Sequence, residues 1–300
     1  MYDIIIIGGG PAGLTAALYA QRANKTVLVI EKGSFGGQIT YSPKVENIPG
    51  FLEVTGNEFA EKLIEQVLNQ GAEVECAEVL GVTDGEYKTV HTDSGDYKAK
   101  SVIIATGAKH RMLGLEREQD FVGEGISFCA VCDGAFYEGK TVAVIGGGNS
   151  ALQEALLLCD LAKKVYVIQN LDYFTGESKL VEQLKTKDNA EIILGTVVES
   201  LLGHSSLEGI IVKTNNGEQK QIALDGMFVA VGLIPQNEPF ASVITLNDWG
   251  YVEAGENCLT SKEGFFVAGD CRSKKIRQVA TAAADGAIAA LAACDYIEQK

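Results

Sequence analysis

Runs of apolar residues that end in glycine begin two similar segments of the chain. Asp3–Gly13 reads DIIIIGGGPAG and Thr141–Ala151 reads TVAVIGGGNSA. In each, the apolar run predicts a buried β-strand, the glycines predict a tight turn, and the residues beyond predict a helix. A second apolar run follows in both segments, at Thr26–Glu31 and at Lys164–Gln169. The pattern therefore predicts two strand–helix–strand units.

The two units are in register with each other. Glu31 follows Gly8 by 23 positions, and Gln169 follows Gly146 by the same 23 positions. Such an internal repeat is typical of paired nucleotide-binding folds. We therefore expect an α/β protein with two Rossmann-like, three-layer nucleotide-binding domains.

The remaining patterns indicate that the second domain is inserted into the first. Shorter patterns after the first repeat predict a helix and three strands, at Glu58–Gln70, Glu73–Cys76, Glu86–Val90 and Tyr97–Ala99. Beyond these come two buried runs and an alanine-rich helix, at Ser101–Gly107, Gly264–Asp270 and about Gln278–Ile297. The second unit already has its own sheet, so these last pieces are interpreted as belonging to the first. We expect a discontinuous first domain of residues 1–114 and 241–300, with residues 115–240 inserted.

Composition and charge narrow the class of protein. The chain has 300 residues, enough for two domains with cores of their own. Its net charge of −15 argues against nucleic acid as a partner, since a binder needs a basic face. No run of about 18 apolar residues is present, so we expect no membrane span. No basic segment precedes the first apolar run, so we expect no signal peptide and a cytoplasmic protein.

The first glycine motif predicts a dinucleotide site. Gly8, Gly10 and Gly13 satisfy the G-x-G-x-x-G pattern, which allows backbone to approach a pyrophosphate at a helix N-terminus. Glu31 ends the second strand, where an acid accepts hydrogen bonds from a ribose. The alternative is a glycine turn with only a structural role.

Among the seven cysteines, only Cys129 and Cys132 are close in sequence. Cysteines at this spacing can form an easily reduced disulfide. The alternatives are a zinc site, which needs about four ligands, and two inert thiols. The other five cysteines are scattered, and their default interpretation is that of small buried hydrophobes. We expect no metal.

The chain resembles the low-molecular-weight thioredoxin reductases over nearly its whole length. The resemblance rests on eight motifs. They are GGGPAG at Gly8, GGQIT at Gly36–Thr40, VENIPG at Val45–Gly50, IATG at Ile104–Gly107, CAVCDG at Cys129–Gly134, GGGNSA at Gly146–Ala151, VAGD at Val267–Asp270 and RQVATA at Arg277–Ala282. The resemblance implies a homodimeric flavoprotein with FAD in the discontinuous domain and the redox cysteines in the inserted one.

The resemblance also assigns residues to the FAD. Gly8–Gly13 would hold the pyrophosphate, Glu31 the ribose, Asp270 the ribitol, and Gln38 and Asn47 the isoalloxazine side. The helix that Arg277, Gln278 and Val279 open would face the flavin N1–C2=O edge, where a helix N-terminus stabilises negative charge. The full set expected to contact FAD is Gly8, Gly10, Pro11, Ala12, Gly13, Glu31, Lys32, Gly37, Gln38, Asn47, Ala105, Thr106, Gly107, Gly269, Asp270, Arg277, Gln278 and Val279.

By the same resemblance, the two cysteines have different roles. Cys132 would face the flavin, and Cys129 would attack the disulfide of thioredoxin. Asp133 follows Cys132 directly, and beside a flavin and a sulfur it would be partly desolvated, with a raised pKa. It would then donate a proton to the leaving thiolate. The alternative for Asp133 is a helix-start cap.

The second glycine motif departs from the family at its ribose position. NADPH-using members carry a His-Arg-Arg cluster and a further arginine there, whereas this chain has Gln169, Asn170 and Leu171. The stretch Gln169–Ser178 has no Lys, Arg or His, and it has two acids, Asp172 and Glu177. A 2′-phosphate is disfavoured there. An NAD site would want an acid at position 169.

This departure points to another electron source. One resembling subgroup, the ferredoxin-dependent flavin thioredoxin reductases, receives electrons from reduced ferredoxin, and we expect the same here. The alternatives are an NADH- or NADPH-dependent reductase with an atypical coenzyme site, and a flavin redox sensor without turnover. Ferredoxins are usually acidic, so a chain of −15 would repel one unless a local basic patch offset the charge. Two candidate patches are Arg272, Lys274, Lys275 and Arg277, and Lys109, His110 and Arg111; each is equally well interpreted as a solvated loop.

Overall fold

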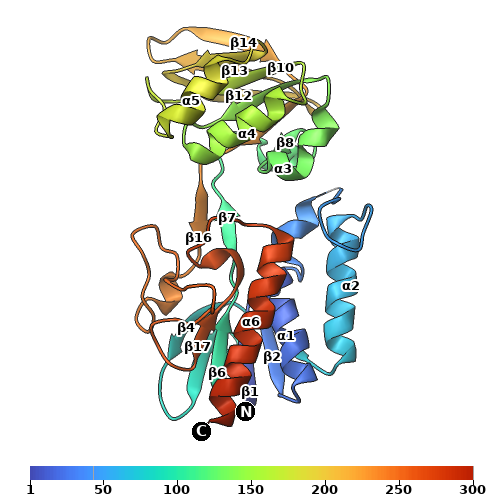
Figure 1. Ribbon diagram of the computed structural model, residues 1–300, viewed down its shortest axis with the longest axis vertical. Helices are drawn as coiled ribbons and strands as arrows, with labels where there is room; N and C mark the ends of the chain where they lie inside the picture. Colours follow the sequence, from blue (N-terminus) through green and yellow to red (C-terminus); the bar gives the residue numbers. More distant parts are fainter. Residues whose placement is uncertain (43, 300) are drawn as a thin grey trace. The chain divides into compact units, whose positions relative to one another are not determined.

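The computed structural model describes residues 1–42 and 44–299, which form two compact units (Figure 1). One unit combines Met1–Lys109 with Ile234–Lys300, and the other is the intervening His110–Leu233. Both are α/β units built around a mainly parallel sheet. The second is therefore an insertion into the first.

The discontinuous unit is built on a seven-stranded sheet of order β3-β2-β1-β6-β5-β4, with β17 also paired to β6. β1, β2, β3, β6 and β17 pair in parallel, while β4 and β5 form an antiparallel extension. The strand bounds are Tyr2–Ile7 (β1), Val27–Glu31 (β2), Glu73–Cys76 (β3), Val79–Thr83 (β4), Lys88–Thr92 (β5), Gly95–Ile104 (β6) and Phe265–Val267 (β17).

Helices cover one face of this sheet. They are α1 (Pro11–Arg22), α2 (Gly56–Asn69) and α6 (Val279–Glu298), and their small apolar side chains form one core with β1, β2 and β6. The opposite face packs against the chain around Phe240–Val252, which forms the second core. Three 3₁₀ turns also lie in the described part of this unit: η1 (Gly37–Tyr41), η4 (Glu238–Phe240) and η5 (Gly269–Cys271).

By length and composition alone, α6 is apolar enough to cross a membrane. Its packing is that of a core helix. Ala289, Ala290 and Ala293 are fully buried, and a Cβ at Gly286 would collide with the Ala12 carbonyl oxygen of α1. Asp285 on the same helix forms buried ion pairs. The absence of a side chain at Gly286 lets α1 and α6 approach closely.

The inserted unit has a parallel five-stranded sheet of order β11-β10-β9-β15-β8. Helices cover one face, and an antiparallel three-stranded sheet lies over the other, each with its own core. The parallel strands are Ile126–Ser127 (β8), Thr141–Ile145 (β9), Lys164–Ile168 (β10), Ala190–Ile193 (β11) and Gly226–Val229 (β15). The remaining elements are β12 (Thr196–Gly203), β13 (Leu207–Thr214), β14 (Gln219–Ala223), α3 (Ala130–Asp133), α4 (Asn149–Cys159), α5 (Ser178–Lys185), η2 (Gln119–Phe121) and η3 (Gly134–Tyr137).

The chain passes between the units through β7 (Ala108–His110) and β16 (Leu233–Pro235), which pair with each other. The units divide after residues 109 and 233, whereas the sequence placed the divisions after residues 114 and 240. Side-chain packing explains these positions. Leu113 and Leu115 pack against the core of the inserted unit, and Phe240 is buried in the core of the discontinuous unit.

Candidate functional site in two glycine turns and a cysteine helix

The first glycine turn joins β1 to α1 at the carboxyl edge of the sheet. Gly8 has a φ of +112°, and a Cβ there would collide with the Ala105 carbonyl oxygen. A Cβ at Gly13 would collide with the Gly8 carbonyl oxygen. Glu31 supports the turn, because its Oε2 accepts a hydrogen bond from the Gly9 N–H at 2.7 Å. Only glycine fits the two colliding positions, so the turn requires the sequence it has.

Residues that follow β6 and β17 lie at the same edge. Ala105 N–H donates to the Ile7 carbonyl at 2.7 Å, and Thr106 Oγ1 donates to Asn237 Oδ1 at 3.1 Å. Asp270 follows β17, and its Oδ1 is buried with no hydrogen-bond partner among the described residues. Burial raises the pKa of Asp270, with nearby cations opposing the shift. An oxygen in this state suits a hydroxyl-bearing ligand.

The start of α6 gathers three further expected residues. Gln278 caps the helix, accepting a hydrogen bond from Asn47 Nδ2 at 3.1 Å. The Arg277 guanidinium lies over the Tyr251 ring at 4.5 Å, and its Nε is buried without a partner among the described residues. Gln38 donates from Nε2 to the Ala108 carbonyl.

These features of the discontinuous unit fit an FAD. No described side chain caps the N-terminus of α1, so its N–H groups are free for a pyrophosphate. Asp270 Oδ1 and Arg277 Nε are buried polar atoms that a bound ligand would satisfy. Lys32 of the expected set forms an ion pair with Glu78 of the same chain at the surface.

Cys129 and Cys132 are joined by a disulfide at the start of α3, with their Cα atoms 5.3 Å apart. Cys129 is the N-cap residue of α3, and its Sγ accepts from the Cys132 N–H at 3.2 Å. Val131 between them is 63% exposed. The short helix that holds the disulfide thus exposes the residue between the two cysteines, while the cysteines themselves are half-buried.

Asp133 ends α3 beside the disulfide. Its Oδ2 accepts from Ser127 Oγ at 2.6 Å, and its Oδ1 is buried without a partner among the described residues. Burial raises the pKa of Asp133, and the Ser127 hydrogen bond opposes that shift. The interpretation of Asp133 as a helix-start cap is wrong, because its side chain makes no capping hydrogen bond at the start of η3.

Sequence reasoning missed Glu154, which lies in α4 next to α3. Burial raises the pKa of Glu154 to about 8, opposed by a hydrogen bond from the Ala130 backbone and assisted by the Asp133 charge. The sequence signal that could have indicated burial of Glu154 is its helical spacing from apolar residues. Glu154 is three residues after Ala151 and four before Leu158, both fully buried, so it falls beside the apolar stripe of α4.

The second glycine turn resembles the first in backbone conformation, but it has no acidic residue at the position of Glu31. Gly146 has a φ of +135°, as the tight turn requires. Gln169 is 5% exposed, and its Nε2 donates to the Tyr173 carbonyl at 3.3 Å. Glu177 is the N-cap residue of α5, and its Oε1 accepts a hydrogen bond from Nδ2 of Asn149, the first residue of α4, at 3.0 Å. The place of a coenzyme ribose is thus occupied by a neutral amide bonded within its own loop, with an acid nearby.

Comparison with known proteins supports these observations. A family model described as "Pyridine nucleotide-disulphide oxidoreductase" matches residues 2–286. The thioredoxin reductase of Bacillus subtilis (strain 168) is 40% identical over 302 residues, covering 100% of this chain and 96% of the relative. The chain belongs to the low-molecular-weight thioredoxin reductase family. Its cofactor is FAD, as in that family, and its redox-active disulfide is Cys129–Cys132.

Other relatives of this thioredoxin reductase family member are similar along their whole length. A "34.2 kDa protein in rubredoxin operon" of Clostridium pasteurianum is 41% identical, covering 99% of this chain and 98% of the relative. The crystal structure of thioredoxin reductase from Streptococcus pyogenes MGAS5005 matches with a TM-score of 0.95 at 38% identity, covering 100% and 99% of the two chains. The α/β fold with two nucleotide-binding sheets is confirmed by this match.

The first candidate basic patch of this reductase family member is not a surface patch. Arg272 and Lys274 have side chains only 2% and 6% exposed, and both bind the buried Asp285 at 2.9 Å. Arg277 stacks on Tyr251. Of the four residues, Lys275 alone is exposed. The sequence could not show that Asp285, 13 positions after Arg272, neutralises this cluster.

The second candidate patch contains one cation fewer than the sequence suggested. The His110 ring stacks on Phe128, with centroids 4.6 Å apart, and burial lowers the pKa of His110 to about 4. His110 is therefore neutral at pH 7, which leaves Lys109 and Arg111 as exposed cations.

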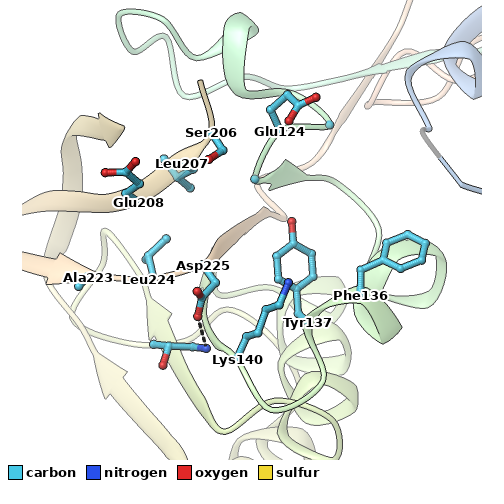
Figure 2. Close-up of a pocket in the computed structure, with 13 residues that line it drawn as sticks. Glu124, Phe136, Tyr137, Lys140, Ser206, Leu207, Glu208, Ala223, Leu224 and Asp225 are labelled. Carbon is cyan, nitrogen blue, oxygen red and sulfur yellow. Dashed lines mark hydrogen bonds between the residues drawn. The ribbon is translucent and has the colours of Figure 1, made fainter. Parts of the chain in front are cut away.

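A pocket of about 650 Å³ lies in the inserted unit (Figure 2). Its lining includes no residue of the glycine turn at Gly146. It opens where β9 and β15 begin, with Tyr137, Lys140 and Asp225 among its lining residues. Ligands of open α/β sheets bind at the carboxyl ends of strands. The pocket is at the opposite, amino end, so it is not a coenzyme site.

The five other cysteines divide into two kinds. Cys159, Cys258, Cys271 and Cys294 are buried, as the default interpretation expected, and burial raises the pKa of each thiol. Cys76 on β3 is exposed, so that interpretation is wrong for it. Strand β3 is at the edge of its sheet, which is why a cysteine there reaches the surface.

Proposed function

We propose that this protein is a thioredoxin-disulfide reductase whose FAD receives electrons from reduced ferredoxin. The observation that supports this donor most directly is Gln169. A coenzyme ribose at that position would meet a buried neutral amide already bonded to the Tyr173 carbonyl, and no cation follows it as far as Ser178. Binding of a 2′-phosphate without a cation is unfavourable.

The comparison of the two repeats strengthens this argument. Glu31 is charged and accepts hydrogen bonds from the Gly9 and Gly33 N–H groups at 2.7 and 2.8 Å. Its counterpart Gln169 offers an amide, a weaker acceptor than a carboxylate. The inserted unit thus carries the cysteines in a nucleotide-binding fold without the charge that selects a nucleotide.

In this proposal the residues take the roles that the family resemblance suggests. FAD would be held by the eighteen residues expected from the sequence, with Asp270 Oδ1 and Arg277 Nε satisfied by it. FAD supplies the chemistry that passes electron pairs to a disulfide. Cys132 would face the flavin, Cys129 would exchange with thioredoxin, and Asp133 would protonate the leaving thiolate. We also propose a cytoplasmic homodimer, for which light scattering in solution is the test.

The test is the anaerobic visible absorbance of the oxidised flavin. The protein is mixed with excess NADPH, then NADH, then photoreduced ferredoxin. We expect no rapid bleaching with either nucleotide, bleaching with ferredoxin, and recovery of the absorbance on addition of oxidised thioredoxin. Because a 41% identical relative is described by its place in a rubredoxin operon, reduced rubredoxin is tested as a further donor. Rapid bleaching by a nucleotide would contradict the proposal.

A variant tests whether residues 169–171 determine which electron donor the protein uses. The triple substitution Q169H/N170R/L171R restores the cations that NADPH-using members carry. We expect it to bleach with NADPH at least about 10-fold faster than the wild type, since a hydrogen bond to a charged group contributes about 1.5–3 kcal/mol and tenfold corresponds to about 1.4 kcal/mol. An unchanged response would show that these three positions do not decide the donor.

The second candidate is an NADH- or NADPH-dependent reductase with an atypical site. The observation that favours it is the intact turn at Gly146, whose φ of +135° matches the role of Gly8. The same bleaching experiment separates the two donors. A redox sensor without turnover would be supported instead if C129S left the physiological function intact.

A further inference from the structure

Glu154 is a second buried carboxyl at the redox centre, on a different element from Asp133. It lies on α4, which packs against α3. A hydrogen bond from the backbone of Ala130 holds its carboxyl against the first residue of α3, directly after Cys129. Glu154 therefore contacts the helix that joins the two cysteines.

Both carboxyls are half satisfied in the oxidised protein. Asp133 accepts from Ser127 and Glu154 accepts from Ala130. Asp133 Oδ1 and Glu154 Oε2 are each buried without a partner among the described residues. Unsatisfied buried polar atoms are unfavourable and call for an explanation. A disulfide carries no proton, whereas the reduced pair carries two. The two unpartnered oxygens can therefore exchange protons with the cysteines only when the disulfide is reduced.

The surroundings of Glu154 favour its protonated form. Burial is the main cause that raises its pKa to about 8, and Asp133 is the ionisable group whose charge adds to that shift. α4 also packs against α5, β9 and β10. The ionisable side chains of these elements are Lys179, Glu182 and Lys185 on α5, and Lys164 and Tyr166 on β10. None of these contributes to the shift, and Lys164 and Lys185 are paired with other acids.

We propose that Glu154 is a positioning residue that stores a proton for the redox centre and returns it to Asp133 after Asp133 has protonated a leaving thiolate. The inference rests on the proposed role of Asp133 and is independent of the electron donor. It explains why two half-satisfied carboxyls flank one short helix.

The chemistry balances with two carboxyls and two sulfurs. When a dithiol reduces the Cys129–Cys132 bond, its first thiolate attacks one sulfur and the other leaves as a thiolate, which takes a proton from Asp133. Glu154 then gives its proton to the Asp133 carboxylate through one water, since no hydrogen bond joins Asp133 Oδ1 to Glu154 Oε2 in the oxidised protein. The second thiolate of the dithiol displaces the remaining sulfur, which takes that proton from Asp133. The dithiol is oxidised to a cyclic disulfide, and the two carboxylates regain protons from water.

The test uses dithiothreitol as the reductant, so neither ferredoxin nor thioredoxin is needed. The holoenzyme is reduced anaerobically from pH 6 to 9.5, quenched in acid, and alkylated, and the reduced pair is quantified by mass spectrometry. After correction for the thiolate fraction of dithiothreitol, the wild-type rate is expected to be level up to about pH 8 and then to fall as Glu154 loses its proton.

The decisive variant is E154Q, since glutamine keeps an oxygen to accept from Ala130 but has no proton to give. We expect its corrected rate at pH 7 to be about 10-fold lower, less than the 10²–10⁴ typical of direct proton transfer, and its profile to lack the fall near pH 8. D160N, which alters an exposed carboxyl just beyond the same helix, should match the wild type.

Two results would overturn the proposal. One is an E154Q profile equal to that of the wild type. The other is a uniform loss of rate with the fall near pH 8 retained, which would mean a purely structural role. If E154Q does not fold, E154D takes its place; it keeps a proton, so absence of the alkaline fall would count against the proposal. D133N is measured in parallel to distinguish failure of this proposal from failure of the role proposed for Asp133. Unchanged kinetics in D133N would refute the role of Asp133 itself.

Discussion

At the scale of single residues, burial raises the pKa of several acidic groups. It raises the pKa of Asp133 and Glu154, and it raises the pKa of Cys159 and Cys271 to about 11. Thiols with such values are protonated and unreactive at neutral pH. Cys159 and Cys271 are therefore inert, whereas α3 presents the Cys129–Cys132 pair beside two carboxyls whose pKa values burial raises.

Glu154 should make the stability of the protein depend on pH. Its pKa is raised by folding from an ordinary 4.5 to about 8, so the stability it contributes is fully present below pH 4.5 and is lost as pH rises through 8. E154Q removes that loss. We expect the melting temperature of E154Q, relative to the wild type, to be higher at pH 9 than at pH 5 by about 3 °C or more.

Differential scanning calorimetry at the two pH values measures this difference. D160N serves as the control and should show no such trend, since its carboxyl is exposed. A difference between E154Q and the wild type that is the same at both pH values would contradict the raised pKa.

Local patterns made some residues predictable and others not. The glycines, Glu31, the cysteine pair and Asp133 belong to short motifs whose chemistry depends on neighbours in sequence. Glu154 and the Arg272–Asp285 pair depend on elements that meet only in the fold. A charged side chain is exposed in most proteins, so a sequence gives little reason to bury one.

At the scale of elements, periodicity predicted the strands of the two repeats but missed others, including β4 and the three-stranded sheet β12–β14. It also divided one strand that changes partners. The sequence predicted separate strands at Tyr97–Ala99 and Ser101–Gly107, but Gly95–Ile104 is one strand, β6. Its first half pairs antiparallel with β5 and its second half pairs in parallel with β1. The first half alternates in exposure and the second is wholly buried, so two patterns appear in one element.

Asp285 joins α6 to the turn that carries Asp270. It accepts from the Gly269 N–H at 3.0 Å, from Arg272 and from Lys274. D285N removes the buried counter-charge of Lys274 and leaves Arg272 only its contact with the exposed Glu256, so we expect a loss of about 3–5 kcal/mol in the free energy of unfolding. Urea denaturation followed by the release of flavin fluorescence measures it.

E256Q is the matched control for D285N. Glu256 pairs with the same Arg272 at 3.4 Å, but its side chain is 90% exposed. We expect a loss below about 1 kcal/mol, as for other surface ion pairs. Equal losses in the two variants would show that burial of the Asp285 cluster contributes nothing.

At the scale of the whole molecule, charge shapes the encounter with a donor. The net charge is −15, and the cations that the sequence offered as a docking patch are mostly internal or neutral. Long-range repulsion of an acidic ferredoxin is screened by salt. We therefore expect the second-order rate of flavin reduction by ferredoxin to rise as ionic strength increases from about 10 to 150 mM.

Stopped-flow absorbance over that range of salt provides the measurement. Reduction by dithionite under the same conditions corrects for effects of salt on the flavin itself. A rate that falls with salt would mean that a local basic surface attracts the donor despite the net charge.

The paired crossings β7 and β16 have a consequence for how such a chain can arise. Arg111 N–H donates to the Gly232 carbonyl at 3.0 Å, so the two ends of the inserted unit lie one hydrogen bond apart. A segment with adjacent ends can be spliced into a host, or removed from it, without pulling the host's strands apart. Residues 110–233 thus have the form of a cassette, exchangeable as a whole at the level of the gene.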